Sequence, residues 1–76
     1  MNKARRLALE ALKDQLEDIK SSLEDIQSDE EEYRDNMPEN MQGGERYEKA
    51  EAAISNMEDA VSSLEEAISS IESAAE

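Results

Sequence analysis

The sequence predicts an all-α fold, an antiparallel coiled-coil hairpin of two helices. Two apolar stripes with alternating steps of three and four residues, one in each half of the chain, predict the helices. The only proline and both glycines lie between the stripes, in residues 37–44, and predict the turn. We expect a single helical hairpin domain over residues 1–76, with helix one at about 3–35, the turn at about 36–44 and helix two at about 45–75.

Helix one is predicted by seven-residue repeats that begin at Leu9. Its expected core stripe is Leu9, Leu12, Leu16, Ile19, Leu23 and Ile26, and Tyr33 ends it. Ala, Leu, Glu, Lys and Gln, which favour helices, are frequent here. Helix one must end before Pro38, because proline cannot continue a helix and restricts the residue before it.

The turn should contain a helix cap made by glycine. Gly43 suits a left-handed cap on a short turn that begins near Pro38. Gly44 suits the N-cap of helix two, where Glu45 and Glu48 would lie favourably in the first turn.

Helix two repeats the pattern from Tyr47. Its expected core stripe is Tyr47, Ala50, Ile54, Met57, Val61, Leu64, Ile68 and Ile71. Its many serines weaken the helix propensity somewhat. A disordered acidic chain has no reason to maintain such spacing, so the pattern favours an ordered structure.

The flanking charges predict how the two helices align. Antiparallel coiled coils bring the e positions of one helix against those of its neighbour. Folding the chain back near residue 40 would pair helix one's bases with helix two's glutamates. The expected contacts are Arg6 with Glu72, Lys13 with Glu65, Lys20 with Glu58, and Gln27 with Glu51.

A second copy of the chain is the expected partner. A 76-residue chain buries too little surface to be comfortably stable alone, and without Cys or His it lacks disulfides and the usual zinc ligands. Small residues beside the core stripes would form a low-relief strip on which a second hairpin could lie, giving a homodimeric four-helix bundle. The bland alternative is that Ala and Ser are merely adequate surface residues. The candidate dimer interface consists of Ala4, Leu7, Ala8, Ala11, Ala53, Ala60, Ser63, Ala67, Ser70 and Ala74.

The net charge of −13 argues against direct binding of nucleic acid or anionic membrane. It also suggests a second function, in which a rigid acidic rod imitates nucleic acid and occupies the basic cleft of a host nuclease or defence protein. The alternative is that the acidic faces only confer solubility. The candidate acidic partner surface consists of Asp18, Glu24, Asp25, Glu31, Asp59, Glu65 and Glu66.

The sequence predicts no catalytic residue, cofactor or metal site. The absence of His and Cys removes the commonest general base, the thiolate nucleophile and the usual transition-metal ligands. The acidic run Asp29–Glu32 lacks the glycine and ligand spacing of a calcium loop. We therefore expect a non-enzymatic protein that binds or organises another protein. No stretch approaches a membrane span or a signal-peptide core, so a cytoplasmic location is expected.

The turn carries the least generic residues, Asn36-Met37-Pro38-Glu39-Asn40-Met41-Gln42 followed by Glu45-Arg46-Tyr47-Glu48. This segment, which runs into Ala-rich acidic heptads, resembles the small acidic, uncharacterised helical-hairpin proteins of bacteriophages and prophages. The similarity covers mainly residues 36–48. It implies a phage or mobile-element origin, with the cytoplasm of a bacterial host as the location, and it carries no functional residue.

Overall fold

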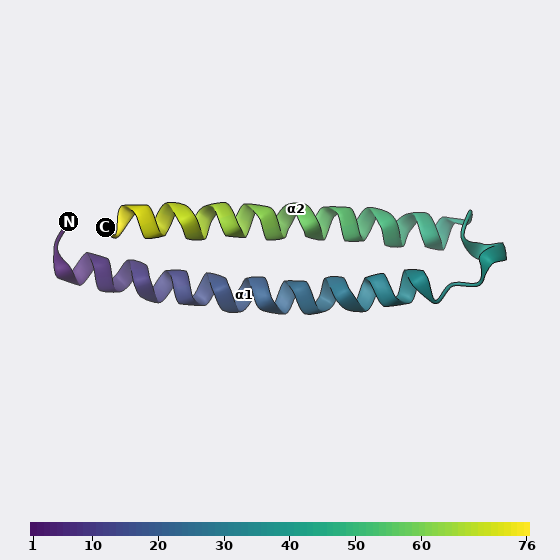
Figure 1. Ribbon diagram of the computed structural model, residues 1–76, viewed down its shortest axis with the longest axis horizontal. Coiled ribbons are helices and arrows are strands. Elements are labelled where there is room, and N and C mark those ends of the chain that lie inside the picture. Colours follow the sequence, from purple (N-terminus) through teal and green to yellow (C-terminus); the bar gives the residue numbers. More distant parts are fainter.

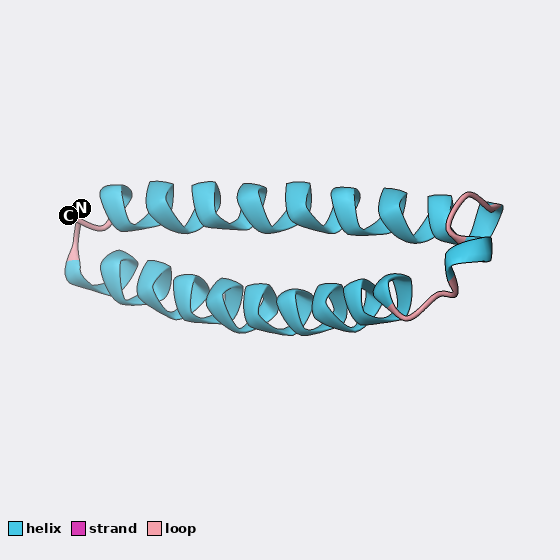
Figure 2. Cartoon of the chain, turned by 45° about the vertical axis from the view of Figure 1, so that its right-hand side comes forward, coloured by secondary structure: helices cyan, strands magenta, loops and turns pink.

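The computed structural model describes residues 1–76 as two long antiparallel helices that lie side by side (Figure 1). Helix α1 spans Lys3–Asp35 and helix α2 spans Glu45–Ala74. The connection contains a short 3-10 helix, η1, at Glu39–Met41. Both termini lie at one end of the rod, opposite the turn (Figure 2). The predicted antiparallel helical hairpin is confirmed.

Helix α1 begins with a side-chain cap. The side-chain oxygen of Asn2 accepts a hydrogen bond of 2.8 Å from the backbone N–H of Arg5, which has no partner inside the helix. At the other end, the backbone N–H of Asn36 donates to the carbonyl of Glu32 at 3.0 Å. The helix thus ends at Asp35, three residues before Pro38.

The chain reverses without a left-handed residue, so the prediction of a left-handed cap at Gly43 is wrong. Pro38 has φ −57°, and its carbonyl accepts a hydrogen bond of 2.9 Å from the N–H of Met41. This 3-10 turn makes the bend that a left-handed glycine would otherwise make. Met37 is buried and anchors the turn.

Gly44 is the N-cap of α2, with extended backbone at φ −88° and ψ 174°. Its N–H donates to the carbonyl of Met41 at 3.0 Å, and a Cβ built on Gly44 would lie 3.2 Å from that same oxygen. Glu45 and Glu48 lie in the first turn of α2, where negative charge is favourable.

The hairpin is a thin rod with almost no interior. It measures 60 × 14 × 12 Å, and its radius of gyration is 17.3 Å, against about 11 Å for a compact domain of this length. Only Met37, Ala50, Ile54 and Ile68 are buried, and none of them belongs to α1. Neither helix has a stretch long and apolar enough to cross a membrane.

Half of the predicted core stripe of α1 faces outward. Leu9, Leu16 and Leu23 are half-buried against α2, whereas Leu12, Ile19 and Ile26 are exposed. The helix is turned so that the row Lys13, Lys20, Gln27 and Arg34 faces α2 in their place. Lysine and arginine stems can cover apolar surface while their charges reach outward, which explains how these residues occupy the contact.

Each observed ion pair joins a lysine to a glutamate one heptad from the predicted one, although the helices and the turn have the predicted bounds. Lys13 Nζ lies 3.8 Å from Glu72 Oε1, and Lys20 Nζ lies 3.7 Å from Glu65 Oε1. The sequence prediction paired these lysines with Glu65 and Glu58, which lie seven residues earlier. The heptad repeat itself explains the error, because a shift by seven residues restores the same pattern of charges.

Candidate interaction surface

An apolar row runs along the exposed side of α1. It consists of Leu12, Ile19, Ile26 and Tyr33, spaced seven residues apart, and each is between 49% and 58% exposed. Ile19 and Ile26 line a shallow, mostly apolar hollow together with Leu23, Asp18 and Ser22. A contiguous exposed row of large apolar side chains marks an interaction surface more often than scattered ones do.

Helix α2 adds a row of small residues to the same side of the hairpin. Ala53, Ala60 and Ala67 are half-buried beside α1. In an antiparallel pair the g positions of both helices lie on one flank, and in α2 these positions are Ala53, Ala60 and Ala67. The e positions, which include Lys13 and Lys20, lie on the other flank. The lysine–glutamate pairs occupy the e flank, so the alanines and the apolar row lie together on the opposite flank. We call this surface, formed by the apolar row with Ala53, Ala60 and Ala67, the open flank.

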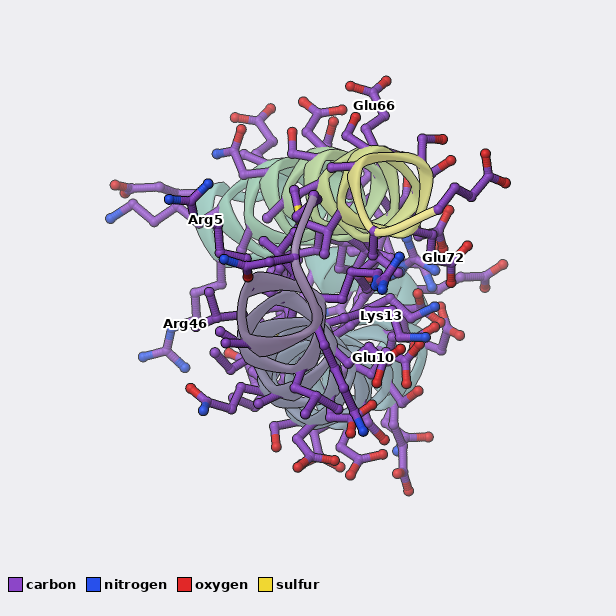
Figure 3. The ribbon with its side chains drawn as sticks, turned by 90° about the vertical axis from the view of Figure 1, so that its left-hand side faces the viewer. Arg5, Glu10, Lys13, Arg46, Glu66 and Glu72 are labelled. Carbon is purple, nitrogen blue, oxygen red and sulfur yellow. The ribbon has the colours of Figure 1, made fainter.

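The end-on view separates the two flanks. In Figure 3, Arg5 and Arg46 lie on one side of the rod, and Lys13, Glu10 and Glu72 lie on the other. Arg5 stands one heptad before Leu12, and Arg46 stands one heptad before Ala53. The open flank therefore begins with an arginine on each helix, at opposite ends of the rod.

The other residues of the predicted dimer interface are exposed, although not all of them lie on the open flank. Ser63, Ser70 and Ala74 border it on α2. On α1, Ala8 lies beside the start of the apolar row. Three other exposed residues of α1 occupy heptad positions that face away from α2. These three are Ala4, Leu7 and Ala11.

The sequence prediction missed the residues that are most prominent on this surface. It placed Leu12, Ile19 and Ile26 inside the hairpin, because it assigned both apolar rows of α1 to a single contact. One signal could have separated the rows. Lys13 and Lys20 form a third row, which also suits the contact with α2. One neighbouring helix cannot cover three rows, so one of the apolar rows had to face elsewhere.

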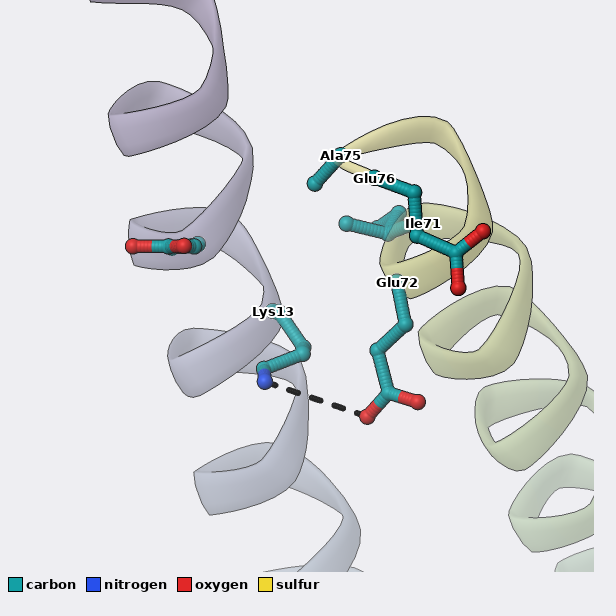
Figure 4. Close-up of a pocket in the computed structure, with 6 residues that line it drawn as sticks. Lys13, Ile71, Glu72, Ala75 and Glu76 are labelled. Atoms are coloured by element: carbon teal, nitrogen blue, oxygen red, sulfur yellow. Dashed lines mark ion pairs between the residues drawn. The ribbon is translucent and has the colours of Figure 1, made fainter. Parts of the chain in front are cut away.

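The opposite flank is polar. Figure 4 shows Lys13 reaching Glu72 beside Ile71 and Ala75, at the end of the rod that carries both termini. The side chains of Lys13 and Lys20 are 28% and 29% exposed, and those of their glutamate partners are more than half exposed. Such solvent-accessible pairs stabilise by only about 0–1 kcal/mol each, so they contribute more to alignment than to stability.

The predicted acidic surface is divided between two faces. Asp18 and Asp25 occupy the outer side of α1, whereas Asp59 and Glu66 occupy the outer side of α2; all four are exposed. Glu66 points away from α1 in Figure 3. The structure does not gather these carboxylates into one patch.

The remaining members of that predicted surface have local partners or stand apart. Glu65 pairs with Lys20. The half-buried Glu31 accepts a hydrogen bond of 2.9 Å from Gln27 Nε2. Glu24 is exposed and lines a hollow with Gln27 and Glu58 on the flank of the ion pairs.

The turn end holds both of the perturbed titratable groups. A hydrogen bond to Glu51, with some loss of hydration, raises the pKa of Tyr47 above its usual 10.0. A hydrogen bond to the carboxylate of Asp35, at 3.0 Å, raises the pKa of Arg34. Both pKa shifts favour the protonated form, and each arises chiefly from a hydrogen bond to a nearby carboxylate. Neither prepares a group for proton transfer near neutral pH.

No arrangement of side chains suits a metal ion. No group of three or more Asp or Glu side chains converges on one point, including those of the run Asp29–Glu32. Successive residues of a helix point in different directions, which separates these carboxylates. No buried side-chain polar atom lacks a hydrogen-bond partner.

Comparison with known proteins adds no relative: no family model, no curated protein and no solved structure matches the chain.

Proposed function

We propose that this chain is a non-enzymatic protein–protein interaction module that works as a homodimer, two hairpins forming a four-helix bundle. The observation that carries the proposal is the apolar row, whose large side chains are each about half exposed. A helix in a four-helix bundle has two neighbours and needs apolar side chains on both sides. Helix α1 has the pattern of such a helix.

The size of the exposed surface agrees with this proposal. The hairpin exposes 5494 Å², whereas a compact folded chain of 8.5 kDa exposes about 4,700 Å². The excess of roughly 800 Å² is what each partner contributes to an interface of standard size. A second copy on the open flank would remove surface of that order.

The dimer can be tested with a matched pair of aspartate substitutions in α1. Ile19→Asp places a charge in the apolar row, whereas Ser28→Asp places the same charge on the flank of the ion pairs. We expect light scattering after size-exclusion chromatography to give a dimer for the unmodified chain and for Ser28→Asp. Ile19→Asp should give a single-chain mass or a loss of helix content. Equal mass and equal melting temperature for the two variants would contradict the proposal.

The proposal extends to an adaptor or structural role, in which the exposed acidic faces and the turn of the dimer contact another protein. The residues of the turn support a phage or prophage origin, which the genes that neighbour its coding sequence would test. Placement among phage structural or replication genes would support such a role. Placement outside any mobile element would count against the origin.

A second candidate function is an acidic inhibitor that imitates nucleic acid. Its support is the row of exposed, unpaired carboxylates on each outer face, represented by Asp18 and Asp25 on α1. Proteins that bind phosphate through charge release their partners as salt rises. We expect the unmodified chain to retain nucleic-acid-binding proteins from a bacterial lysate at low salt, and an Asp18→Asn, Asp25→Asn variant to retain less. Retention that is unaffected by salt or by these substitutions would exclude mimicry.

A further inference from the structure

We infer that the two copies lie antiparallel, with the turn of one hairpin beside the termini of the other and α1 against α1 of its partner. This inference rests on the proposed dimer and specifies its geometry. It is carried by the uneven distribution of charge along the rod and by the symmetry of the open flank.

The two ends of the rod differ in charge. Residues 1–13 and 66–76, at the end with the termini, contain four bases and four acids and are neutral in sum. Residues 29–51, at the turn end, contain nine acids and three bases, a net charge of −6. A parallel dimer would place two ends of −6 together. An antiparallel dimer places each beside a neutral end that begins with Lys3, Arg5 and Arg6.

The open flank is symmetric about its own middle. The apolar row is centred between Ile19 and Ile26, so a twofold axis there pairs Ile19 with Ile26 of the partner subunit and Leu12 with Tyr33 of the partner subunit. The alanine row is centred on Ala60. The ion pair of Lys20 with Glu65 and the hollow shared by Gln27 and Glu58 place Ala60 close to the same level of the rod. A single twofold axis perpendicular to the rod can therefore relate both helices to their copies in the partner subunit.

The surroundings of Arg5 differ between the two arrangements. A twofold axis along the rod would bring each residue of the flank close to its own copy. Arg5 would then lie near a second Arg5, at an end of the dimer that offers few acidic neighbours. In the antiparallel arrangement Arg5 lies at the same end as Arg46 of the partner subunit, but also near the acid-rich turn, which contains Asp35 and Glu39 of the partner subunit.

The chain offers a direct measurement, because it has no cysteine of its own. Gly43→Cys introduces an attachment point at the tip of the turn, where a Cβ meets nothing within 4 Å. Ser21→Cys introduces another on the exposed face of α1, near the middle of the rod. A nitroxide spin label on each variant reports the distance between the two copies by pulsed electron paramagnetic resonance.

We expect the Gly43→Cys labels to be separated by a distance comparable to the rod's 60 Å length. The Ser21→Cys labels should lie roughly 20–30 Å apart, a distance set by helix diameters. A short distance for both variants would overturn the antiparallel arrangement and leave the dimer intact, as would a short distance at Gly43 alone. No measurable distance at either site, together with a single-chain mass, would overturn the dimer itself.

Discussion

Ile19 and Lys20 are adjacent in α1 and have surroundings opposite to those that their chemistry suggests. The Lys20 side chain is 29% exposed, with its ammonium 3.7 Å from Glu65, whereas Ile19 is 54% exposed. A lysine tolerates this position because its methylene stem packs while its charge remains hydrated. One exposed isoleucine is ordinary, but an exposed row at heptad spacing makes a continuous apolar surface. At the scale of single residues, the structure thus shows the surface that we propose a partner covers.

The two glycines of the turn should respond differently to alanine. Gly44→Ala brings a Cβ to 3.2 Å from the Met41 carbonyl and replaces a tolerable N-cap with a poor one, so we expect a loss of about 1 kcal/mol in the free energy of unfolding. Gly43→Ala meets open space and removes freedom from the unfolded chain, which should stabilise by about 0.4–1 kcal/mol. Urea unfolding followed by circular dichroism measures both. Equal effects would contradict the described turn.

Tyr47 should make the fold sensitive to alkaline pH. Its pKa is raised in the folded state, chiefly by a hydrogen bond to Glu51, so the folded chain holds the phenolic proton more tightly than the unfolded chain. The resulting stability is present below pH 10 and is lost as the pH rises through the folded pKa. Absorbance titration of a Tyr33→Phe variant isolates Tyr47. Adding Glu51→Ala should lower the measured pKa, and adding Glu48→Ala should change it less.

The two helices contribute unequally to the buried residues of the hairpin. Helix α2 contributes three of the four buried residues, and α1 contributes none. Helix α1 meets α2 through Leu9, Leu16 and Leu23 together with the row that contains Lys13 and Lys20. Its apolar row then remains for a second neighbour. The asymmetry between the helices is what the proposed four-helix bundle explains.

The alignment of the helices can be measured with double-mutant cycles. We expect Lys20→Ala and Glu65→Ala to be coupled by about 0.2–1 kcal/mol in the free energy of unfolding, because their charges lie 3.7 Å apart. Lys20→Ala and Glu58→Ala, the pair that the sequence suggested, should show coupling near zero. Stronger coupling of Lys20 with Glu58 than with Glu65 would support the pairing predicted from the sequence.

The sequence was sufficient for the hairpin but not for the orientation of α1. Periodic leucines and isoleucines specify a helix, and Pro38 specifies where the first helix ends. Whether Ile19 or Lys20 faces α2 depends on the rotation of one helix against the other, which a repeat with two apolar rows leaves open. The pairing of Lys20 with Glu65 over Glu58 was equally open, because the charge pattern repeats every seven residues. The use of Pro38 in place of Gly43 to make the turn depended on backbone geometry.

The whole molecule is a rod of uneven charge with very little interior. Its net charge of −13 is concentrated in the middle and at the turn, and the end with the termini is neutral. Self-repulsion opposes both folding and association. In the proposed dimer, contact through the open flank would offset part of this repulsion.

Screening or titrating the charge should therefore stabilise the fold. Lowering the pH from 7 toward about 5 brings the chain closer to its isoelectric point of about 4.2, so its net negative charge falls. Adding sodium chloride to about 1 M shortens the Debye length to about 3 Å and weakens the repulsion without titration. We expect the thermal midpoint, followed by circular dichroism, to rise in both cases. A fall in both cases would show that the ion pairs outweigh the repulsion.

Sedimentation equilibrium of the unmodified chain at tens of micromolar tests the central claim most directly, because it measures whether a second copy binds the hairpin. The mass of one chain is 8.5 kDa. The proposed dimer predicts a mass twice as large, with high helix content in the same sample. A fully helical species of 8.5 kDa at every concentration would contradict it, because the apolar row would then remain exposed in a stable, solitary hairpin.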